Sequence, residues 1–583
     1  MRHSTAHLLA AAVAKLWPKT KFGVGPAIEN GFYYDFEFPQ KITEEDLLKI
    51  EQKMKEIAGK GISFEQTEMS IDESLKFEKR RGQIYKQELI EQINRLGSTS
   101  MEKEALEEIG REKINKVNYY KLGEFIDLCR GPHVKTTKEI GSFKLLNIAG
   151  SYWRGSENNP MLTRIYGTVW PSKKELDNHL IQQEEIKKRD HKKIGLEQEL
   201  FMFHETAPGM PYWLPKGLTL LNVLTNFWRK TYLKEDYYEI SSPLINEKKL
   251  WETSGHWKFY KDDMFVIQVD KQTTYGVKPM NCPNAMIVFG SKQRSYKDLP
   301  LRLADIDQIH RFERSGTLNG LFRTRQFQQD DAHIFITEEQ IAGEYEKILK
   351  LADKFYSIFN LSYSLRLGTR PDKYLGEKVV WDKAEVILKN ILEKSGREYS
   401  ILEGDGAFYG PKIDILMKDS LGREWQMGTV QLDFHLPKRF KLKYIANNGS
   451  KQTPVVIHHV IYGALGRFIG ILTEHYFGAF PLWLSPIQAV VIPITERNNQ
   501  YAKDLRNQLF DNDFRVEIDS RNETMQTKIR NAQLQKIPYM LVIGDREQVQ
   551  KKVAIRSRKK GDEGVVSISD LITRLKDEVE NKS

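Results

Sequence analysis

A chain of 583 residues is too long for a single hydrophobic core and predicts about three to five domains. With 40% hydrophobic residues, 29% charged residues and only two cysteines, it cannot be a disulfide-stabilised scaffold, and a reducing, cytoplasmic setting is favoured. The formal net charge of +10 suits a polyanionic partner such as nucleic acid. No run of about 18 apolar residues occurs, so no membrane span is expected.

The first region, residues 1–171, predicts a mixed α/β domain. The apolar run near its start could pass for a weak signal-peptide core, but Leu8, Leu9, Val13 and Leu16 fit one face of a helix better. Turn-rich strands are expected at 23–38 and 125–152, on either side of a charged helical stretch at 43–116.

Three further regions follow along the chain. Residues 172–195 predict a linker helix that begins with a capping box of Ser172 and Glu175. Aromatic-rich strands and polar loops over 196–481 predict a large antiparallel sheet with flanking helices. Residues 482–583 alternate β-rich runs, at 489–493, 514–518 and 539–544, with charged helical patterns, which indicates a small α/β domain. The basic run 551–560 is interpreted as a solvated loop or as a contact for RNA phosphates.

The most specific segment is the arginine-rich stretch 310–333, which predicts two strands around a loop at Gly316–Gly320. A nucleotide site needs a guanidinium group at the α-phosphate, a carboxylate at the adenine edge and an aromatic face for stacking. Arg311, Glu313 and Phe327 supply these groups. The alternative is an exposed charged hairpin without a ligand.

This hairpin resembles motif 2 of the class II aminoacyl-tRNA synthetases, and Gly463–Gly470 resembles their motif 3. Finer similarity is to the threonyl-tRNA synthetases, in the segments 278–283, 328–335, 404–413, 428–434 and 454–458. The resemblance covers essentially the whole chain. It implies an α/β multidomain (α+β) protein: an N-terminal α+β editing domain at 1–171, a linker helix at 172–195, a class II antiparallel-sheet catalytic domain at 196–481 and an α/β anticodon-binding domain at 482–583.

The resemblance also implies roles for individual residues in a reaction that uses ATP and Mg²⁺. Arg311 would bind the α-phosphate, Arg323 the terminal phosphates, and Phe327 and Arg467 the two faces of the adenine. The remaining residues implied at this site are Glu313 at the adenine edge, Gln431 at the nucleotide and His256 near the 3′-terminal ribose of the tRNA. Partners implied in the same way are tRNA(Thr), threonine and a second copy of the chain in a homodimer.

Cys282, His333 and His458 have no compact metal-binding spacing, and alone each would be interpreted as a core residue. The family resemblance makes them ligands of one zinc ion per subunit, with coordination positions left open. Zinc can bind the amino group and the hydroxyl of threonine, and valine lacks that hydroxyl. Loss of such a polar contact can reject an analogue by roughly 10⁴–10⁵. The neighbouring pocket residues implied by the family are Gln329, Asp331 and Tyr409.

Serine keeps the hydroxyl and lacks only one methyl group, a difference worth about 1–3 kcal/mol, so a second, hydrolytic site is expected. Its candidates, in the N-terminal domain, are His3, His7, Tyr34, Lys86, Asp127, Cys129 and His133. From the residue types alone, three imidazoles and a thiol could also hold zinc, or could have a purely structural role. The family resemblance favours a metal-free deacylase in which His3 or a neighbouring imidazole positions water, and in which Cys129 is part of the wall.

Anticodon bases are expected to meet Asn522, Glu547 and Arg556, which match the base-reading positions of the family. The sequence also departs from the family pattern at Asn284 and Ala285, at His459 and at Gly466, and Met1 lies where a small N-terminal ubiquitin-like domain would usually precede. These departures leave two alternatives open: an RNA-binding regulator without activation activity, and a deacylase whose catalytic domain only positions tRNA.

Overall fold

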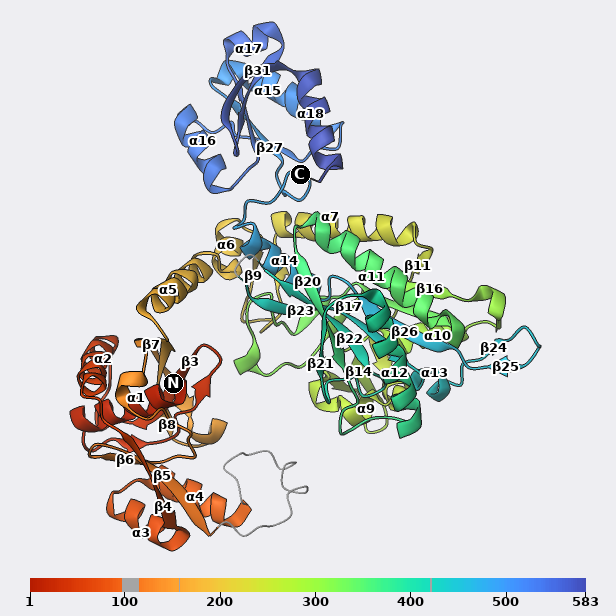
Figure 1. The fold of residues 1–583 in the computed structure, drawn as a ribbon. Coiled ribbons are helices and arrows are strands. Elements are labelled where there is room, and N and C mark those ends of the chain that lie inside the picture. Colours follow the sequence, from red (N-terminus) through yellow and green to blue (C-terminus); the bar gives the residue numbers. More distant parts are fainter. Residues whose placement is uncertain (97–114, 157, 420–421, 583) are drawn as a thin grey trace. The chain divides into compact units, whose positions relative to one another are not determined.

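The computed structural model describes residues 1–96, 115–156, 158–419 and 422–582 (Figure 1). These residues form two compact units, Met1–Glu185 and Ile186–Ser583. In the described part of the chain, no helix is long and apolar enough to cross a membrane. The mixed α and β composition and the large antiparallel sheet expected from the sequence are both confirmed.

The first unit is built around a five-stranded sheet with the order β1-β3-β8-β7, to which β2 adds beside β3. The strands are β1 (Lys21–Phe22), β2 (Ala27–Ile28), β3 (Gly31–Glu37), β7 (Ser142–Tyr152) and β8 (Met161–Trp170). Helix α1 (Arg2–Leu16) packs on this sheet and is buried from Ser4 to Val13. The helix expected near the N-terminus is therefore present, but it is covered by core on all sides rather than along one apolar face.

The charged stretch 43–116 is not wholly helical. It contains helices α2 (Glu44–Gly59), α3 (Ile71–Arg80) and α4 (Ile84–Leu96), but also strand β4 (Phe64–Ser70). Strand β4 pairs with β5 (Lys116–Leu122), which pairs in turn with β6 (Phe125–Leu128). Strand β4 is largely exposed, and its sequence has no strict alternation of apolar and polar residues, so its pairing with β5 and not a sequence period determines it. Residues 97–114 of the stretch lie outside the described residues.

The linker expected at 172–195 consists of two helices instead of one. The backbone N–H of Ser172 donates to Glu175 (2.9 Å), and the backbone N–H of Glu175 donates to the Ser172 hydroxyl (3.2 Å), so α5 (Lys173–Lys188) begins with the predicted capping box. The chain then breaks at Asp190, whose carboxylate accepts from the backbone N–H of Lys192 (2.8 Å) and caps α6 (His191–Glu197). The predicted boundaries at 171, 195 and 481 stay predictions.

The second unit contains an eight-stranded sheet with the order β11-β16-β19-β26-β23-β22-β20-β21. Its strands are β11 (Tyr237–Glu239), β16 (Leu301–Asp305), β19 (Asp331–Ile336), β20 (Ser362–Gly368), β21 (Tyr399–Leu402), β22 (Lys412–Lys418), β23 (Glu424–Asp433) and β26 (Val455–Val460). All neighbours are antiparallel except the two edge pairs β11·β16 and β20·β21. The sheet shares one core with helices α7 (Pro215–Leu233), α11 (Ile341–Ile358), α12 (Lys378–Ser395) and α14 (Leu465–His475).

A second, five-stranded sheet lies near the C-terminus, with the order β28-β27-β29-β30-β31 and a separate hydrophobic core. Strands β27 (Ala489–Pro493), β28 (Val516–Ile518) and β29 (Tyr539–Ile543) lie within the predicted runs. They alternate with helices α15 (Asn499–Phe510) and α16 (Met525–Leu534) and are followed by α17 (Asp545–Gln550) and α18 (Ile568–Glu580). The loop expected at 551–560 is wrong, because β30 (Lys552–Ser557) occupies most of it and pairs with β31 (Gly561–Ser567).

Candidate functional site

A cavity of about 490 Å³ opens on the large sheet of the second unit. Most of the site residues expected in this unit line it: Cys282, Arg311, Glu313, Arg323, Phe327, Gln329, Asp331, Tyr409, Gln431, His458 and Arg467. The other two, His333 and His256, are fully buried and are not part of the cavity wall. The fold therefore brings together segments that are widely separated in the sequence.

Three arginines of this cavity lie in or beside the predicted hairpin. Strand β17 (Gln308–His310) pairs with β18 (Gln326–Gln328), which forms the predicted hairpin with shorter strands than expected. Arg311 follows β17, with its guanidinium carbon 5.2 Å from the centre of the Phe327 ring. Arg323 donates to the Glu313 carboxylate over 2.8 Å. Three guanidinium groups and two carboxylates, Glu313 and Asp331, line the cavity, which leaves net positive charge that suits a polyphosphate.

Arg467 is partly buried. It lies in the first turn of α14 and donates to the backbone carbonyl of Phe322 (2.8 Å) and of Gln426 (3.4 Å). Burial, followed by the charges of Arg311 and Arg323, lowers the pKa of Arg467. These backbone contacts hold its side chain in the cavity wall beside the hairpin.

The thiol and imidazole groups of Cys282, His333 and His458 converge behind the same wall. Strands β19 and β26 pair so that His333 lies directly opposite His458, and Cys282 begins helix α10 (Cys282–Gly290). One ligand atom from each residue lies within 4.8 Å of the other two. Strand register thus produces the cluster that sequence spacing alone could not suggest.

Several polar atoms of this cluster are buried without a partner. Both ring nitrogens of His333 and Nδ1 of His458 have no hydrogen bond, which is costly for buried polar atoms. Burial also lowers the pKa of His333 well below its usual value and raises the pKa of the Cys282 thiol well above its own. A zinc ion would take up these lone pairs and stabilise the thiolate. The residues present therefore fit the metal.

The surrounding polar residues complete this part of the cavity. Nε2 of His458 lies 3.0 Å from the Asp433 carboxylate, which orients the ring as a second ligand shell would. Tyr409 donates to the side-chain carbonyl of Gln431. Asp331 accepts from the Asn281 amide over 3.3 Å, and burial raises its pKa to about 6. Gln431 thus lies beside Tyr409 and His458, while the expected contact with nucleotide stays a prediction.

His256 occupies a buried position next to the cavity. Its Nδ1 lies 2.8 Å from the Ser254 hydroxyl and its Nε2 3.1 Å from the sulfur of Met280, which does line the cavity. Burial lowers the pKa of His256 to about 3, so the ring is neutral near pH 7. The expected role near the tRNA ribose stays a prediction.

The departures from the family pattern have different surroundings. Asn284 and Ala285 are buried in α10 behind the cysteine. His459 follows a zinc-ligand candidate in β26, so its side chain points to the other face of the sheet, where its Nε2 lies 2.9 Å from the Tyr237 hydroxyl. A Cβ atom added to Gly466 would have its nearest neighbour at 3.7 Å, in the Trp213 ring. Lack of space therefore does not explain this glycine.

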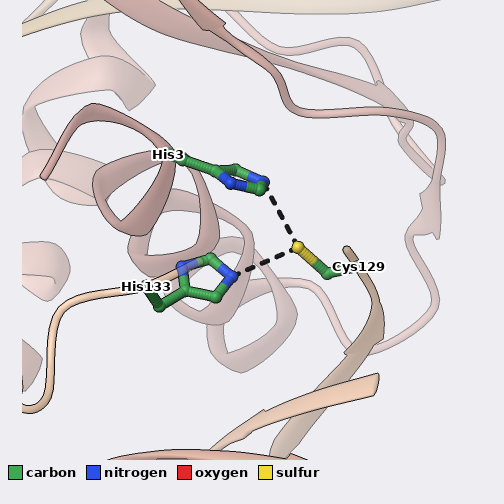
Figure 2. Close-up of side chains that lie close together, drawn as sticks. All are labelled: His3, Cys129 and His133. Carbon is green, nitrogen blue, oxygen red and sulfur yellow. Dashed lines mark hydrogen bonds between the residues drawn. The ribbon is translucent and has the colours of Figure 1, made fainter. Parts of the chain in front are cut away.

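A second cavity, of about 860 Å³, lies in the first unit. His3, His7, Tyr34, Lys86, Asp127 and Cys129 line it, and His133 lies directly behind Cys129. Figure 2 shows the Cys129 sulfur between two imidazoles, at 3.2 Å from Nε2 of His3 and 3.2 Å from Nε2 of His133. The structure thus brings all seven candidates together.

The electrostatics of this second cavity keep its imidazoles neutral. Burial lowers the pKa of His3, lowers that of His7 to about 4 and lowers that of His133 to about 3. Burial raises the pKa of Cys129 to about 11, which opposes a role as nucleophile at neutral pH.

A charged trio lies beside these imidazoles. Nζ of Lys86 is 2.7 Å from the Asp127 carboxylate, and Tyr34 donates to the same carboxylate. Burial alone would raise the pKa of Asp127, but the Lys86 charge brings it below its usual value. Asp127 is therefore a fixed negative charge in the wall.

The three expected anticodon residues do not all lie at one edge of the C-terminal sheet. Because β28 and β29 are both parallel to β27, their carboxyl ends meet at the same edge. Asn522 follows β28, and Glu547 lies in α17, which begins two residues after β29. Arg556 lies in β30 opposite Met540, nearer the other end of β29.

Models of three domain families match successive parts of this chain. The model of the Threonyl and Alanyl tRNA synthetase second additional domain matches residues 117–166. That of the tRNA synthetase class II core domain (G, H, P, S and T) matches residues 265–476. The model of an anticodon binding domain matches residues 488–578.

Curated relatives resemble the chain over its whole length. The threonine–tRNA ligase of Desulforamulus reducens is 49% identical over 100% of this chain and 89% of its own, and that of Acetivibrio thermocellus is 47% identical over 100% and 88%. The chain belongs to the threonine–tRNA ligase family.

Two solved structures of threonyl-tRNA synthetases are also similar to this chain. The RNA binding domain of threonyl-tRNA synthetase from Cryptosporidium parvum matches with a TM-score of 0.65 and 43% identity, covering 67% of this chain and 98% of that one. The putative threonyl-tRNA synthetase ThrRS-1 from Aeropyrum pernix matches with a TM-score of 0.57 and 27% identity, covering 68% of this chain and 97% of that one.

Two carboxylates that support the site of this threonine–tRNA ligase family member were missed in the sequence. The Asp433 carboxylate contacts Nε2 of His458 and accepts hydrogen bonds from the backbone N–H groups of His435 and Leu436, at 2.7 and 3.0 Å. Asp330 accepts three backbone N–H groups, from Ile461, Tyr462 and Gly463, and so fixes the turn between β26 and α14. Both lie inside the segments 328–335 and 428–434 that resemble the family, which was the available signal.

Proposed function

We propose that the cavity of the second unit activates threonine with ATP and passes it to tRNA, as expected for a threonine–tRNA ligase. The observation that carries this proposal is the lining of one cavity by three arginines together with two residues of a buried cysteine–histidine cluster. Polyphosphate recognition and metal-based amino acid recognition are thereby available at the same place. The full-length relatives named threonine–tRNA ligase favour this function over that of a regulator without activation activity.

In the first step, the threonine carboxylate attacks the α-phosphorus of ATP and pyrophosphate leaves. Arg311 would stabilise the charge on the α-phosphate, and Arg323 would bind the departing phosphates together with Mg²⁺. Phe327 and Arg467 would hold the adenine between them, with Glu313 at its edge. In the second step, a hydroxyl of the 3′-terminal ribose attacks the adenylate carbonyl and AMP leaves, with His256 close to that ribose.

Recognition of threonine is proposed to depend on zinc held by Cys282, His333 and His458. Zinc, when bound, supplies a Lewis acid for the amino and hydroxyl groups of the amino acid. Asp331 would accept a hydrogen bond from the hydroxyl, and Asp433 would fix the His458 ring. Gln329 and Tyr409 would close the pocket around the methyl group.

Pyrophosphate exchange measured with threonine, serine and valine tests this proposal. Threonine should support exchange, serine should support it detectably, and valine should not, because valine lacks the hydroxyl. Elemental analysis should find about one zinc per chain, and Cys282→Ala should lose it. Exchange with valine at the level of serine would exclude recognition of the substrate through the metal.

The cavity of the first unit is proposed to hydrolyse serine from mischarged tRNA. The neutral His3 ring can accept a proton from water, and the Lys86–Asp127–Tyr34 group would position the substrate. Cys129 is proposed as a wall residue. A zinc ion bound by His3, Cys129 and His133 is the competing hypothesis, since their ligand atoms also lie within 4.8 Å of one another. A second equivalent of zinc that survives in the Cys282→Ala variant would favour it.

Two further contacts are proposed for the complete assembly. The C-terminal sheet would read the anticodon through Asn522, Glu547 and Arg556. A second copy of the chain would cover the edge strand β11 and its surroundings, where Leu233, Tyr238 and Ile245 are 75%, 64% and 50% exposed. Sedimentation should show a dimer, and Leu233→Asp should shift it towards monomer. A monomeric parent protein would contradict this proposal.

A further inference from the structure

A buried histidine of the linker contacts the hairpin loop at the nucleotide end of the catalytic cavity. His191 is the first residue of α6, and only 1% of it is exposed. Its Nε2 lies 3.0 Å from the backbone nitrogen of Leu321, so Nε2 must accept and Nδ1 must carry the proton. Nδ1 lies 2.8 Å from the Glu474 carboxylate, to which it therefore donates. Both ring nitrogens are thus satisfied, which leaves neither of them for a metal.

The loop that His191 contacts is shaped to receive this ring. Gly320 has a φ of +50°, and a Cβ atom placed there would lie 2.3 Å from Nε2 of His191. The Phe322 ring packs against the imidazole with their centres 4.0 Å apart. Leu321, Phe322 and Arg323 all line the catalytic cavity. The position of the imidazole therefore determines where this part of the cavity wall lies.

The other side of the imidazole is anchored to the helix that carries Arg467. Glu474 lies near the end of α14 and also accepts from the His191 backbone N–H, over 3.0 Å. Its second oxygen accepts from Arg423, which also pairs with Asp419. At the start of the same helix, Arg467 donates to the carbonyl of Phe322. The hairpin loop is thus fixed to α14 at two points, through His191 and through Arg467.

We propose that His191 is a positioning residue for ATP: it fixes the Leu321–Arg323 turn against α14, so that Arg323 and Arg467 meet the nucleotide in the correct geometry. This inference rests on the proposed binding of ATP between these arginines. His191 does not line the cavity itself and acts through the turn. The Cys282 cluster and the residues around it are held by other contacts, so threonine recognition does not depend on the imidazole.

Three substitutions test the two hydrogen bonds of the His191 imidazole separately. His191→Gln can place an amide oxygen near Nε2 and keep the acceptor for Leu321, whereas His191→Asn can keep only the donor to Glu474. His191→Phe fills the space without either hydrogen bond. His204→Gln is the control, because His204 is exposed and its ring bonds to Thr206 (2.9 Å) and packs against Tyr212.

The KM for ATP should rise about tenfold in His191→Phe and His191→Asn, because the buried Leu321 N–H loses its acceptor. The KM for threonine should stay within about twofold of the parent value, and His191→Gln should recover most of the loss. Equal increases in both KM values would overturn the proposal. So would a lower melting temperature with unchanged kinetics, or a His191→Gln variant as impaired as His191→Phe. If His191→Phe does not fold, the Gln and Asn variants give the same comparison.

Failure of the underlying function can be recognised separately. A parent protein without threonine-dependent exchange would contradict the proposed function. Equilibrium dialysis against labelled ATP, on the parent and the same variants, then measures nucleotide affinity without any reaction. An ATP dissociation constant unchanged by His191→Phe would overturn the positioning role. A constant raised about tenfold in His191→Phe and restored in His191→Gln would support it.

Discussion

Arg467 is a partly buried guanidinium group bound by backbone carbonyls, and the residue before it is a glycine. Gly463, Gly466 and Gly470 are three and four residues apart, a spacing that predicts one helix face, and one interpretation of such glycines is close packing. Gly463 is not on this face, because it precedes α14 with a φ of +71°, but it does allow a close approach: an added Cβ would lie 2.4 Å from the Met427 carbonyl oxygen. Close packing does not explain Gly466, whose added Cβ would meet only ordinary contact distances, whereas one at Gly470 would lie 2.9 Å from the Phe322 ring.

Gly466→Glu tests whether a carboxylate beside Arg467 improves the nucleotide site. A carboxylate that pairs with Arg467 would hold its guanidinium in one position at the nucleotide, so the KM for ATP should fall. Discrimination against serine and valine should not change. Gly470→Ala is the control for packing and should destabilise the protein by about 1–3 kcal/mol in a thermal melt. A destabilised Gly466→Glu variant without any kinetic gain would exclude the functional hypothesis.

The reactivity of Cys129 tests whether its thiol is a nucleophile or only part of the wall of the second cavity. Its pKa of about 11 means that the thiolate is scarce at neutral pH and grows about tenfold per pH unit until pH 11. Alkylation by iodoacetamide should therefore be slow at pH 7 and accelerate in this way, as followed by mass spectrometry of the Cys129 peptide. Cys129→Ser should retain hydrolysis of Ser-tRNA. Rapid, complete labelling at pH 7 would contradict the wall role.

At the residue scale, most of the side chains predicted for the catalytic site line one cavity, but the sequence alone could not explain why all of them meet. Arg311, Glu313 and Phe327 could be proposed from residue types, because they lie close together in one hairpin. Cys282, His333 and His458 could not, because strand pairing and not spacing brings them together. Only the resemblance to a family joined them. His191 was missed because nothing in a lone histidine indicates which loop it will contact.

At the scale of elements, side-chain hydrogen bonds at helix ends were the local sequence signals that predicted an element boundary correctly. The capping box at Ser172 and Glu175 predicted the start of α5 correctly. The hydrophobic period predicted the type of element less reliably. The sequence pattern favours a helix at β4 and a loop at β30, whereas both are strands. Half-exposed strands present polar side chains on one face, and tertiary pairing overrides their weak propensity. The break between α5 and α6 was missed although Asp190 is a good N-cap residue.

Asp190 links this helix break to the catalytic cavity. Its carboxylate caps α6 at the turn where His191 is held, and loss of an N-cap costs about 0.5–2 kcal/mol. Asp190→Ala should therefore raise the KM for ATP a few-fold, while Asp190→Asn, which can still cap the helix, should stay near the parent value. Ser172→Ala removes the corresponding cap of α5 and should leave the KM for ATP unchanged. Equal effects of Asp190→Ala and Ser172→Ala on that KM would contradict the link.

At the scale of the whole molecule, synthesis and correction are proposed in two compact units that have separate hydrophobic cores. Among the residues that the structure describes, the lining of each cavity comes from its own unit. Substitutions in the two cavities should therefore have additive effects on free energy.

His3→Ala and His133→Ala should leave the charging of tRNA with threonine unchanged, and Ser-tRNA should accumulate. Aminoacylation with labelled serine, and deacylation of purified Ser-tRNA, measure this directly. His179→Ala is the matched control, because His179 is a buried histidine of the same unit that lies outside the cavity. Normal clearance of Ser-tRNA by His3→Ala and His133→Ala would show that the first unit does not edit in this protein.

The pairing of His333 with His458 across β19 and β26 has a consequence for how the protein is made. A zinc finger carries its ligands within one short peptide and can take up metal as soon as that peptide is translated. In the proposed zinc site each ligand lies in a different segment, at Cys282, His333 and His458, and the last of them is translated late. The complete ligand set therefore forms only when β19 and β26 have paired. We therefore expect zinc supply in the cell to determine the active fraction of a folded pool, rather than the yield of folding.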